Sequence, residues 1–200
     1  MKAIETITGP VSVLNRDDVD TDQIIPKQFL KRVERTGFGE FLFYDWAKAP
    51  DWDLPRNEIL VAGRNFGCGS SREHAAWALQ DYGFDVVIAP SFGDIFRTNC
   101  TKAGLLPVQV DAAVGEALLA AVEADPAVVL TIDVENRTLL APAAGVSSTF
   151  PLDDFTRMRF IEGLDDIGLT LRNGDAIAAY EAARPAWLPT AAPTAPAAAP

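Results

Sequence analysis

Short apolar runs alternate with stretches of helix-forming residues between positions 59 and 110. Gly83 follows the first of these stretches as a helix C-cap, and Ser91 precedes the second as an N-cap with Asp94 three residues on. Strands that alternate with helices pair in parallel through right-handed crossovers. The pattern therefore predicts a parallel βαβαβ segment, with strands at 59–63, 85–90 and 105–110 and helices at 71–82 and 93–104.

The rest of the pattern is more β-like and is interrupted by Gly and Pro. Residues 7–14 and 18–26 predict strand and loop. A helix at 111–126 and a hairpin around the turn Glu135–Arg137, with strands at 128–134 and 138–142, follow the βαβαβ segment. Two further helices are predicted at 153–164 and 174–183, around a connection at 163–171. From Pro189 the chain consists of Pro, Ala and two Thr residues, so we expect 189–200 to be a disordered tail without function.

Composition narrows the class of protein. The chain has 200 residues, 48% of them hydrophobic, which is enough for a core, and no run approaches the roughly 20 apolar residues of a membrane span. The first residues lack the apolar centre of a signal peptide, so we expect a cytoplasmic protein. A net charge of −11 argues against nucleic acid as a partner. Cys68 and Cys100 are too few for an iron-sulfur cluster, which takes about four thiolates, so any cluster must come from another chain.

A basic stretch stands out against this acidic background. Lys27, Lys31, Arg32 and Arg35 are balanced only by Glu34. The simplest interpretation is the solvated face of a helix. The alternative is a local positive patch that attracts an anionic substrate.

The stretch GRNFGCGSSREHA, residues 63–75, joins a predicted strand to a predicted helix. Glycine-rich turns at a helix N-terminus present free backbone N–H groups and attract anions. The phosphate-binding pattern GxxxxGK[ST] fails, because Cys68 and Gly69 stand where it needs Gly and Lys. Residues 70–73 also fit the capping box S-x-x-E, which is a purely structural interpretation.

The capping box leaves the arginine and the glycines of this stretch unexplained. A free Ser70 hydroxyl beside Arg72, among backbone N–H groups, could be stabilised as an alkoxide and act as a base or nucleophile. A serine hydrolase is poorly supported, because GxSxG is absent. His74, the only histidine, is expected to be a packed helix residue.

Three stretches together resemble the small subunits of 3-isopropylmalate dehydratases, the detached swivelling domain of the aconitase superfamily. They are residues 20–26 (DTDQIIP), 63–75 and 91–100 (SFGDIFRTNC), and the likeness extends from residue 4 to about 188. The resemblance implies an α/β fold: a three-layer β/β/α domain over 1–188, with the parallel βαβαβ segment and a C-terminal helical extension.

The same resemblance implies a hydro-lyase of leucine biosynthesis that acts only with a large subunit, as a heterodimer or heterotetramer. Its substrate is a small dicarboxylate: 2-isopropylmalate loses water to give 2-isopropylmaleate, which is rehydrated to 3-isopropylmalate. No cofactor is expected on this chain, and a [4Fe-4S] cluster is expected in the large subunit.

The resemblance also assigns roles to particular residues. Ser70 is implied as the base, Arg72 as the group that binds a substrate carboxylate, and Asp22 as a further active-site residue that orients Arg72. Gly69 is expected to permit close backbone approach, and Ser71 to stabilise negative charge at the helix N-terminus.

Residues 28–40 are expected to form the loop that recognises the substrate's side group. We expect Val33 or Phe38 to contact the isopropyl group, and Arg32 or Arg35 to supply a further substrate-binding arginine. Two rivals stay open. One is a related hydro-lyase subunit acting on homoaconitate or on citraconate and methylmalate-type acids. The other is an anion-binding module without catalysis.

Overall fold

The computed structural model describes residues 1–32, 34–185 and 187–188. The chain divides into two compact units, Met1–Asp165 and Asp166–Pro200. The division falls well before residue 188, where the sequence places the end of a single domain. The tail predicted at 189–200 lies outside the described residues.

The first unit is built on one seven-stranded sheet with the strand order β4-β3-β2-β1-β5-β6-β7. The strands β1 to β4 are parallel to one another, and β5 to β7 are antiparallel to their neighbours. The long first strand joins the two halves, because residues Thr6 to Pro10 pair with β5 and residues Val11 to Leu14 pair with β2. The strands are β1 (Thr6–Leu14), β2 (Ile59–Ala62), β3 (Val86–Ala89), β4 (Leu106–Gln109), β5 (Val129–Asp133), β6 (Thr138–Ala141) and β7 (Val146–Thr149).

The helices of this unit connect and cover the strands. They are α1 (Thr21–Ile24), α2 (Glu73–Tyr82), α3 (Asp94–Ala103), α4 (Ala112–Ala124) and α5 (Asp154–Glu162), with 3-10 turns at Lys27–Phe29, Gly39–Phe41, Trp46–Lys48 and Pro142–Ala144. The predicted βαβαβ segment, the helix at 111–126, the hairpin of β5 and β6 and the helix at 153–164 are therefore confirmed. The C-cap at Gly83 is confirmed as well, with φ +128°.

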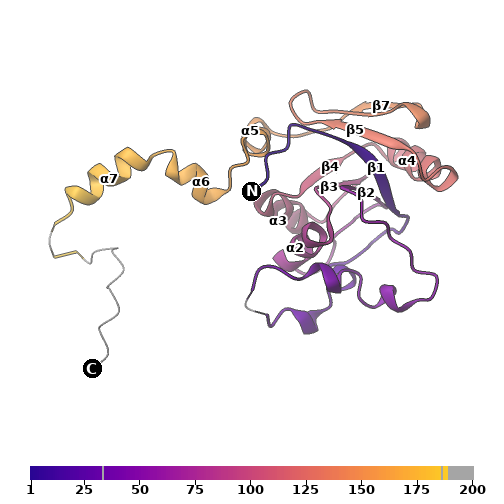
Figure 1. The fold of residues 1–200 in the computed structure, drawn as a ribbon, viewed down its shortest axis with the longest axis horizontal. Helices are drawn as coiled ribbons and strands as arrows, with labels where there is room; N and C mark the ends of the chain where they lie inside the picture. The colour runs from indigo at the N-terminus through magenta and orange to yellow at the C-terminus, as the bar shows by residue number, and fades with distance from the viewer. Residues whose placement is uncertain (33, 186, 189–200) are drawn as a thin grey trace. The chain divides into compact units, whose positions relative to one another are not determined.

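Two hydrophobic cores lie on the two faces of the parallel strands. All residues of β2 and β3 are buried, as expected for strands covered on both faces. Leu60 and Val87 pack with α2 and α3, whereas Val61 and Ile88 pack with α4 and the antiparallel strands. Figure 1 shows α2 and α3 together on one face of these strands, with β5 and β7 toward the other. The result is the β/β/α layering that the resemblance implies.

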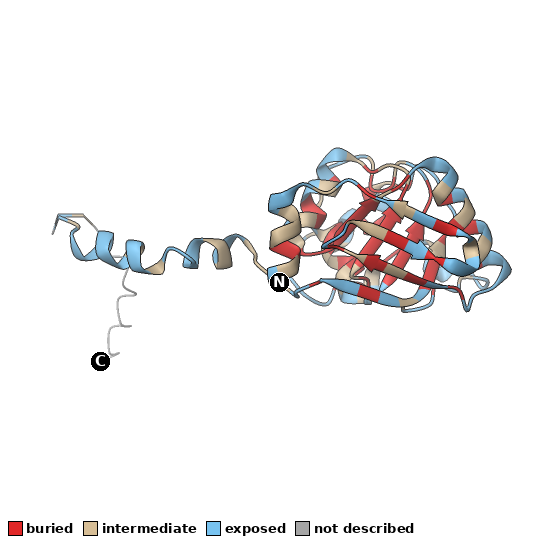
Figure 2. Ribbon diagram, turned by 90° about the horizontal axis from the view of Figure 1, so that it is seen from above, coloured by how far each residue is buried: buried red, intermediate tan, exposed pale blue. Residues whose placement is uncertain are grey.

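In its described residues, the second unit contains α6 (Asp166–Leu171) and α7 (Gly174–Ala182). No residue of either helix is buried, whereas buried residues are concentrated in the sheet of the first unit (Figure 2). The predicted helical extension is therefore present. The stretch expected to be a connection at 163–171 differs, because it contains α6.

Two local predictions are wrong. Ser91 does not cap α3, whose N-cap is Gly93 without a side-chain hydrogen bond. Instead, the Ser91 hydroxyl accepts a hydrogen bond from the Asn65 backbone N–H at 2.9 Å. The basic stretch does not form a helix in its described residues beyond the 3-10 turn at Lys27–Phe29. Its charged side chains are exposed, but no regular helix presents them.

Candidate functional site

The turn between β2 and α2 contains two glycines with left-handed backbone conformations, Gly67 and Gly69. Gly67 and Gly69 have φ of +73° and +84°, the left-handed region that other residues adopt at a cost. A Cβ on Gly67 would lie 2.2 Å from Cγ of Phe96, a ring that is itself buried. Gly69 is exposed, and a Cβ there would meet no atom closer than 3.4 Å. The first glycine therefore lets the turn pack on α3, and the second lets it reverse direction at the surface.

Ser70 and Ser71 lie before α2 and do not belong to it. The helix begins at Glu73 with Arg72 as its N-cap, in an extended conformation (φ −144°, ψ 107°) and without a side-chain cap. The capping-box interpretation of residues 70–73 is therefore wrong. Both serines are exposed, and neither hydroxyl has a hydrogen-bond partner within the described residues. The Ser70 hydroxyl is thus available to a ligand at the start of a ten-residue helix.

Arg72 and Asp22 form a two-point ion pair. Nη2 of Arg72 donates to Oδ2 of Asp22 at 2.6 Å, and Nη1 contacts Oδ1. The Arg72 side chain is only 11% exposed, whereas that of Asp22 is 51% exposed. Hydrogen bonding and the positive charge of Arg72 hold the pKa of the Asp22 carboxyl below its usual range. Asp22 therefore holds the guanidinium of Arg72 in place next to the serines.

The segment that precedes and includes α1 ties down the glycine turn. The Val19 carbonyl accepts hydrogen bonds from the backbone N–H groups of Gly67 and Cys68, at 2.8 and 3.2 Å. Thr21 donates from its backbone N–H to the Cys68 carbonyl at 3.0 Å and from its hydroxyl to the Ser70 carbonyl at 2.8 Å. On the other side of the turn, Ser91 holds Asn65. Two distant segments thus fix the path that leads to Ser70.

The hydrogen bonds by which Thr21 holds the glycine turn were not predicted from the sequence. It stands between the two aspartates of the DTD motif, and it is 1% exposed. A buried polar residue in a motif signals that its hydroxyl has a specific partner, but the sequence does not say which one.

Residues 28–40 pack against the start of α2. Phe38 lies edge-on to the His74 ring, with centroids 5.1 Å apart, and 5.9 Å from the Trp77 ring. Phe38 is fully buried, so the prediction that it contacts a substrate is wrong: the ring has no surface to offer. His74 is packed between aromatic rings as expected, and burial lowers its pKa.

The two arginines of this segment remain at the surface. Arg32 donates to the Gly37 carbonyl at 3.0 Å and stacks over the Phe41 ring, with the guanidinium carbon 5.0 Å from its centroid. Arg35 lies over the Trp77 ring at 5.5 Å. Both are exposed, and Arg35 contacts α2 through Trp77. Val33, the other residue predicted to contact the substrate, lies outside the described residues.

Comparison with known proteins identifies the family. A model of the aconitase C-terminal domain matches residues 46–113, and a model of the C-terminal domain of the 3-isopropylmalate dehydratase small subunit matches residues 166–194. The 3-isopropylmalate dehydratase small subunit of Rubrobacter xylanophilus is 52% identical over 194 residues, which cover 94% of this chain and 98% of the relative. The equivalent protein of Acidothermus cellulolyticus, of the same name, is 56% identical over 195 residues, covering 95% and 98%. This chain belongs to the 3-isopropylmalate dehydratase small subunit family.

A solved structure agrees on the fold of this family member. The crystal structure of the Methanocaldococcus jannaschii 3-isopropylmalate dehydratase (leuD) superposes with a TM-score of 0.65 at 24% identity, covering 88% of this chain and 99% of that one. The match to the aconitase C-terminal domain spans the glycine turn, Ser70 and Arg72. The match to the C-terminal domain of the small-subunit family begins at residue 166, where the second unit begins.

The residues of this small subunit do not fit an iron-sulfur cluster. Cys100 is fully buried, and burial raises the pKa of its thiol well above the usual value. Cys68 donates to the Asp18 carbonyl at 3.4 Å, and its pKa is raised mainly by burial. Within the described residues, no three His, Cys, Asp or Glu side chains are grouped so as to hold a metal ion. None of the helices in the described part of this small subunit has the length and apolar character needed to cross a membrane.

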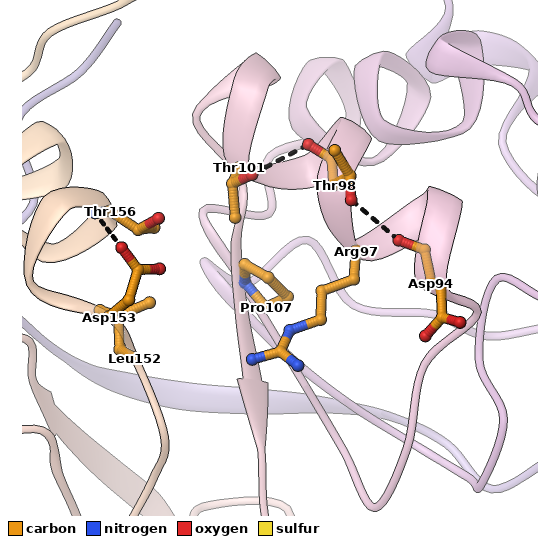
Figure 3. A pocket seen from close by; sticks show the side chains of 8 residues that line it. All are labelled: Asp94, Arg97, Thr98, Thr101, Pro107, Leu152, Asp153 and Thr156. Atoms are coloured by element: carbon orange, nitrogen blue, oxygen red, sulfur yellow. Dashed lines mark hydrogen bonds between the residues drawn. The ribbon is translucent and has the colours of Figure 1, made fainter.

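A separate cavity of about 470 Å³ lies beside α3 and the start of α5. Arg97 and Asp153 enter it from these two elements (Figure 3). Nη1 of Arg97 also lies 3.4 Å from Oε1 of Gln109, and Asp153 caps α5 by accepting from the Thr156 N–H. No residue predicted for the site of this small subunit lines the cavity. We therefore assign the candidate site to the glycine turn and not to this hollow.

Proposed function

We propose that this chain is the small subunit of a 3-isopropylmalate dehydratase. In this proposal it works with a large subunit as a hydro-lyase of leucine biosynthesis. The complex converts 2-isopropylmalate to 3-isopropylmalate through 2-isopropylmaleate. The proposal depends on two observations: the Ser70 hydroxyl is exposed and has no hydrogen-bond partner among the described residues, and Asp22 holds the guanidinium of Arg72 in place.

Ser70 is proposed as the general base that removes a proton from the carbon next to the one that loses its hydroxyl. A serine hydroxyl is a very weak acid, so its alkoxide must be stabilised by its surroundings. The backbone N–H groups of residues 69–72 donate no hydrogen bond within the described chain and lie just before the positive end of α2. Ser71 and Gly69 belong to this group of donors. Together they supply stabilisation that water alone does not provide.

Arg72 is proposed as the group that binds a substrate carboxylate. A guanidinium has five N–H donors on two usable edges. Asp22 occupies the Nη1 and Nη2 pair, and Ile25 accepts a weak 3.5 Å contact from Nη1. The edge formed by Nε and the outer Nη2 hydrogen has no partner within the described residues. A substrate carboxylate is proposed to bind at this edge, two residues from Ser70 along the chain.

The large subunit is proposed to supply what this chain lacks. A [4Fe-4S] cluster held by that subunit would act as a Lewis acid for the departing hydroxyl. On this chain, residues 28–40 are proposed to read the substrate's side group, with Arg32 and Arg35 exposed at the surface. The cytoplasmic location and the stoichiometry of the complex stay predictions.

Reconstitution tests this function. The chain is co-expressed with an isopropylmalate dehydratase large subunit, purified without oxygen, and assayed with isopropylmalate, homoaconitate and a methylmalate. We expect a complex that turns over isopropylmalate in preference to the other acids, and no turnover by the small subunit alone. Preference for homoaconitate or the methylmalate would identify one of the related hydro-lyases. A small subunit that neither binds the large subunit nor changes its activity would overturn the proposal in favour of a non-catalytic module.

A further inference from the structure

We propose that Thr21 is a positioning residue for the base, because its hydroxyl fixes the peptide that follows Ser70. The inference rests on the proposed function of Ser70. Thr21 is 1% exposed, and its Oγ1 donates to the Ser70 carbonyl at 2.8 Å across 49 positions of sequence. Its backbone N–H donates to the Cys68 carbonyl at 3.0 Å. One residue therefore grips the turn on both sides of Gly69.

Ser70 needs such a contact because no regular structure holds it. The ladder of α2 begins only at Glu73, and Arg72, the N-cap, makes no side-chain cap. Gly69, the residue before Ser70, has φ +84° and is conformationally the most permissive residue type. Within the described residues, the carbonyl of Ser70 is its only group with a hydrogen bond. Without the Thr21 hydroxyl, the peptide between residues 70 and 71 would be free to rotate.

A capping box fixes the short helix α1, which carries Thr21. Asp20 caps this helix by accepting from the Gln23 N–H at 2.8 Å, and the Gln23 side chain accepts from the Asp20 N–H at 2.8 Å. The residue after Thr21 is Asp22, which pairs with Arg72. Neighbouring residues of one capped turn thus set the position of the base and of the carboxylate-binding group. This arrangement fixes the distance between the two groups, on which proton abstraction depends.

Two substitutions separate the hydrogen bond from packing. Thr21→Val keeps the volume and removes the donor, whereas Thr21→Ser keeps the donor and removes a methyl group. A role in packing alone would make the serine variant at least as harmful as the valine variant, because the site is buried and serine lacks the methyl group. A positioning role predicts the opposite order.

The experiment uses the complex with the large subunit and measures kcat, KM, thermal midpoint and the kinetic isotope effect with substrate deuterated at the carbon that loses its proton. Thr21→Val should lower kcat about 10- to 100-fold with KM little changed, and raise the isotope effect, because proton transfer becomes slower. Thr21→Ser should retain kcat within a few-fold.

Ser70→Ala in the same series separates the two proposals. Wild-type kcat in Thr21→Val, or an equal loss in Thr21→Ser, would overturn the role of Thr21 if Ser70→Ala is inactive. An active Ser70→Ala would overturn the proposed role of Ser70 itself. If Thr21→Val fails to fold, the serine variant still decides, because a large loss of kcat in a folded Thr21→Ser complex contradicts the inference.

Discussion

Substituting alanine at the two left-handed glycines of the turn should destabilise the protein by different amounts. At Gly67 the new Cβ would lie 2.2 Å from Cγ of Phe96, whose ring is 2% exposed and cannot move away freely. Holding φ at +73° costs an alanine about 1–2 kcal/mol, and overpacking adds about 1–3 kcal/mol. Gly67→Ala should therefore lose about 2–5 kcal/mol of unfolding free energy.

Gly69→Ala is the matched control for this substitution. Its φ of +84° carries the same backbone cost of about 1–2 kcal/mol, but the nearest atom, Cβ of Asp20, is 3.4 Å away and in ordinary contact. Thermal and urea unfolding of both variants measure the difference, and each 1 kcal/mol corresponds to about 2–4 °C for a domain of this size. Equal losses in the two variants, or a larger loss at Gly69, would refute the claim that Gly67 is required for packing against α3.

Two other changes test the ion pair between Asp22 and Arg72 and the division of the chain into two units. Asp22→Asn should raise KM and lower stability by about 1 kcal/mol, a small value because Asp22 is half exposed. The pKa of Asp22 is lowered from 3.8, so its contribution is fully present above pH 3.8 and is lost as the pH falls further. The difference in thermal midpoint between Asp22→Asn and wild type should accordingly stay constant from pH 8 to about pH 5 and disappear in stronger acid. A difference that disappears near neutral pH would contradict the ion pair with Arg72. A chain ending at Asp165 should unfold cooperatively within a few degrees of the wild-type thermal midpoint, because both hydrophobic cores lie in the first unit. Loss of cooperative unfolding would show that the first unit depends on residues after 165.

The alternation of strands and helices could be predicted because it depends on local sequence patterns. Buried strands such as β2 and β3 appear as short apolar runs, and Gly83 marks a helix end by the backbone conformation it allows. The parallel direction of these strands follows from the helical crossovers that connect them. None of these features depends on which distant residue lies opposite.

The start of α2 could not be predicted, because distant contacts decide it. The pattern S-x-x-E is compatible with a helix that begins at Ser70 or Ser71. In the structure, Thr21 holds the Ser70 carbonyl outside the helix, and the helix begins three residues later, at Glu73. Ser91 similarly bonds to Asn65 instead of capping α3. A local motif offers a hydrogen bond, and the tertiary fold determines whether it is used.

The burial of Phe38 could not be predicted from the sequence either. Phe38 was expected to contact the isopropyl group of the substrate because it lies in the segment 28–40. Its burial depends on His74 and Trp77, which α2 presents in its first two turns. The pairing of Asp22 with Arg72, in contrast, agrees with the orienting role implied by the resemblance, and the two-point geometry adds how it is achieved.

The most direct test of the central claim is the turnover of isopropylmalate by the complex carrying Ser70→Ala. Ser147→Ala, an exposed serine on β7, is the matched control. Loss of the general base predicts a fall in kcat of about 10²- to 10⁴-fold, with thermal midpoint and assembly with the large subunit unchanged, and wild-type activity in the control. A Ser70→Ala complex that turns over isopropylmalate within a few-fold of wild type would show that the base lies elsewhere.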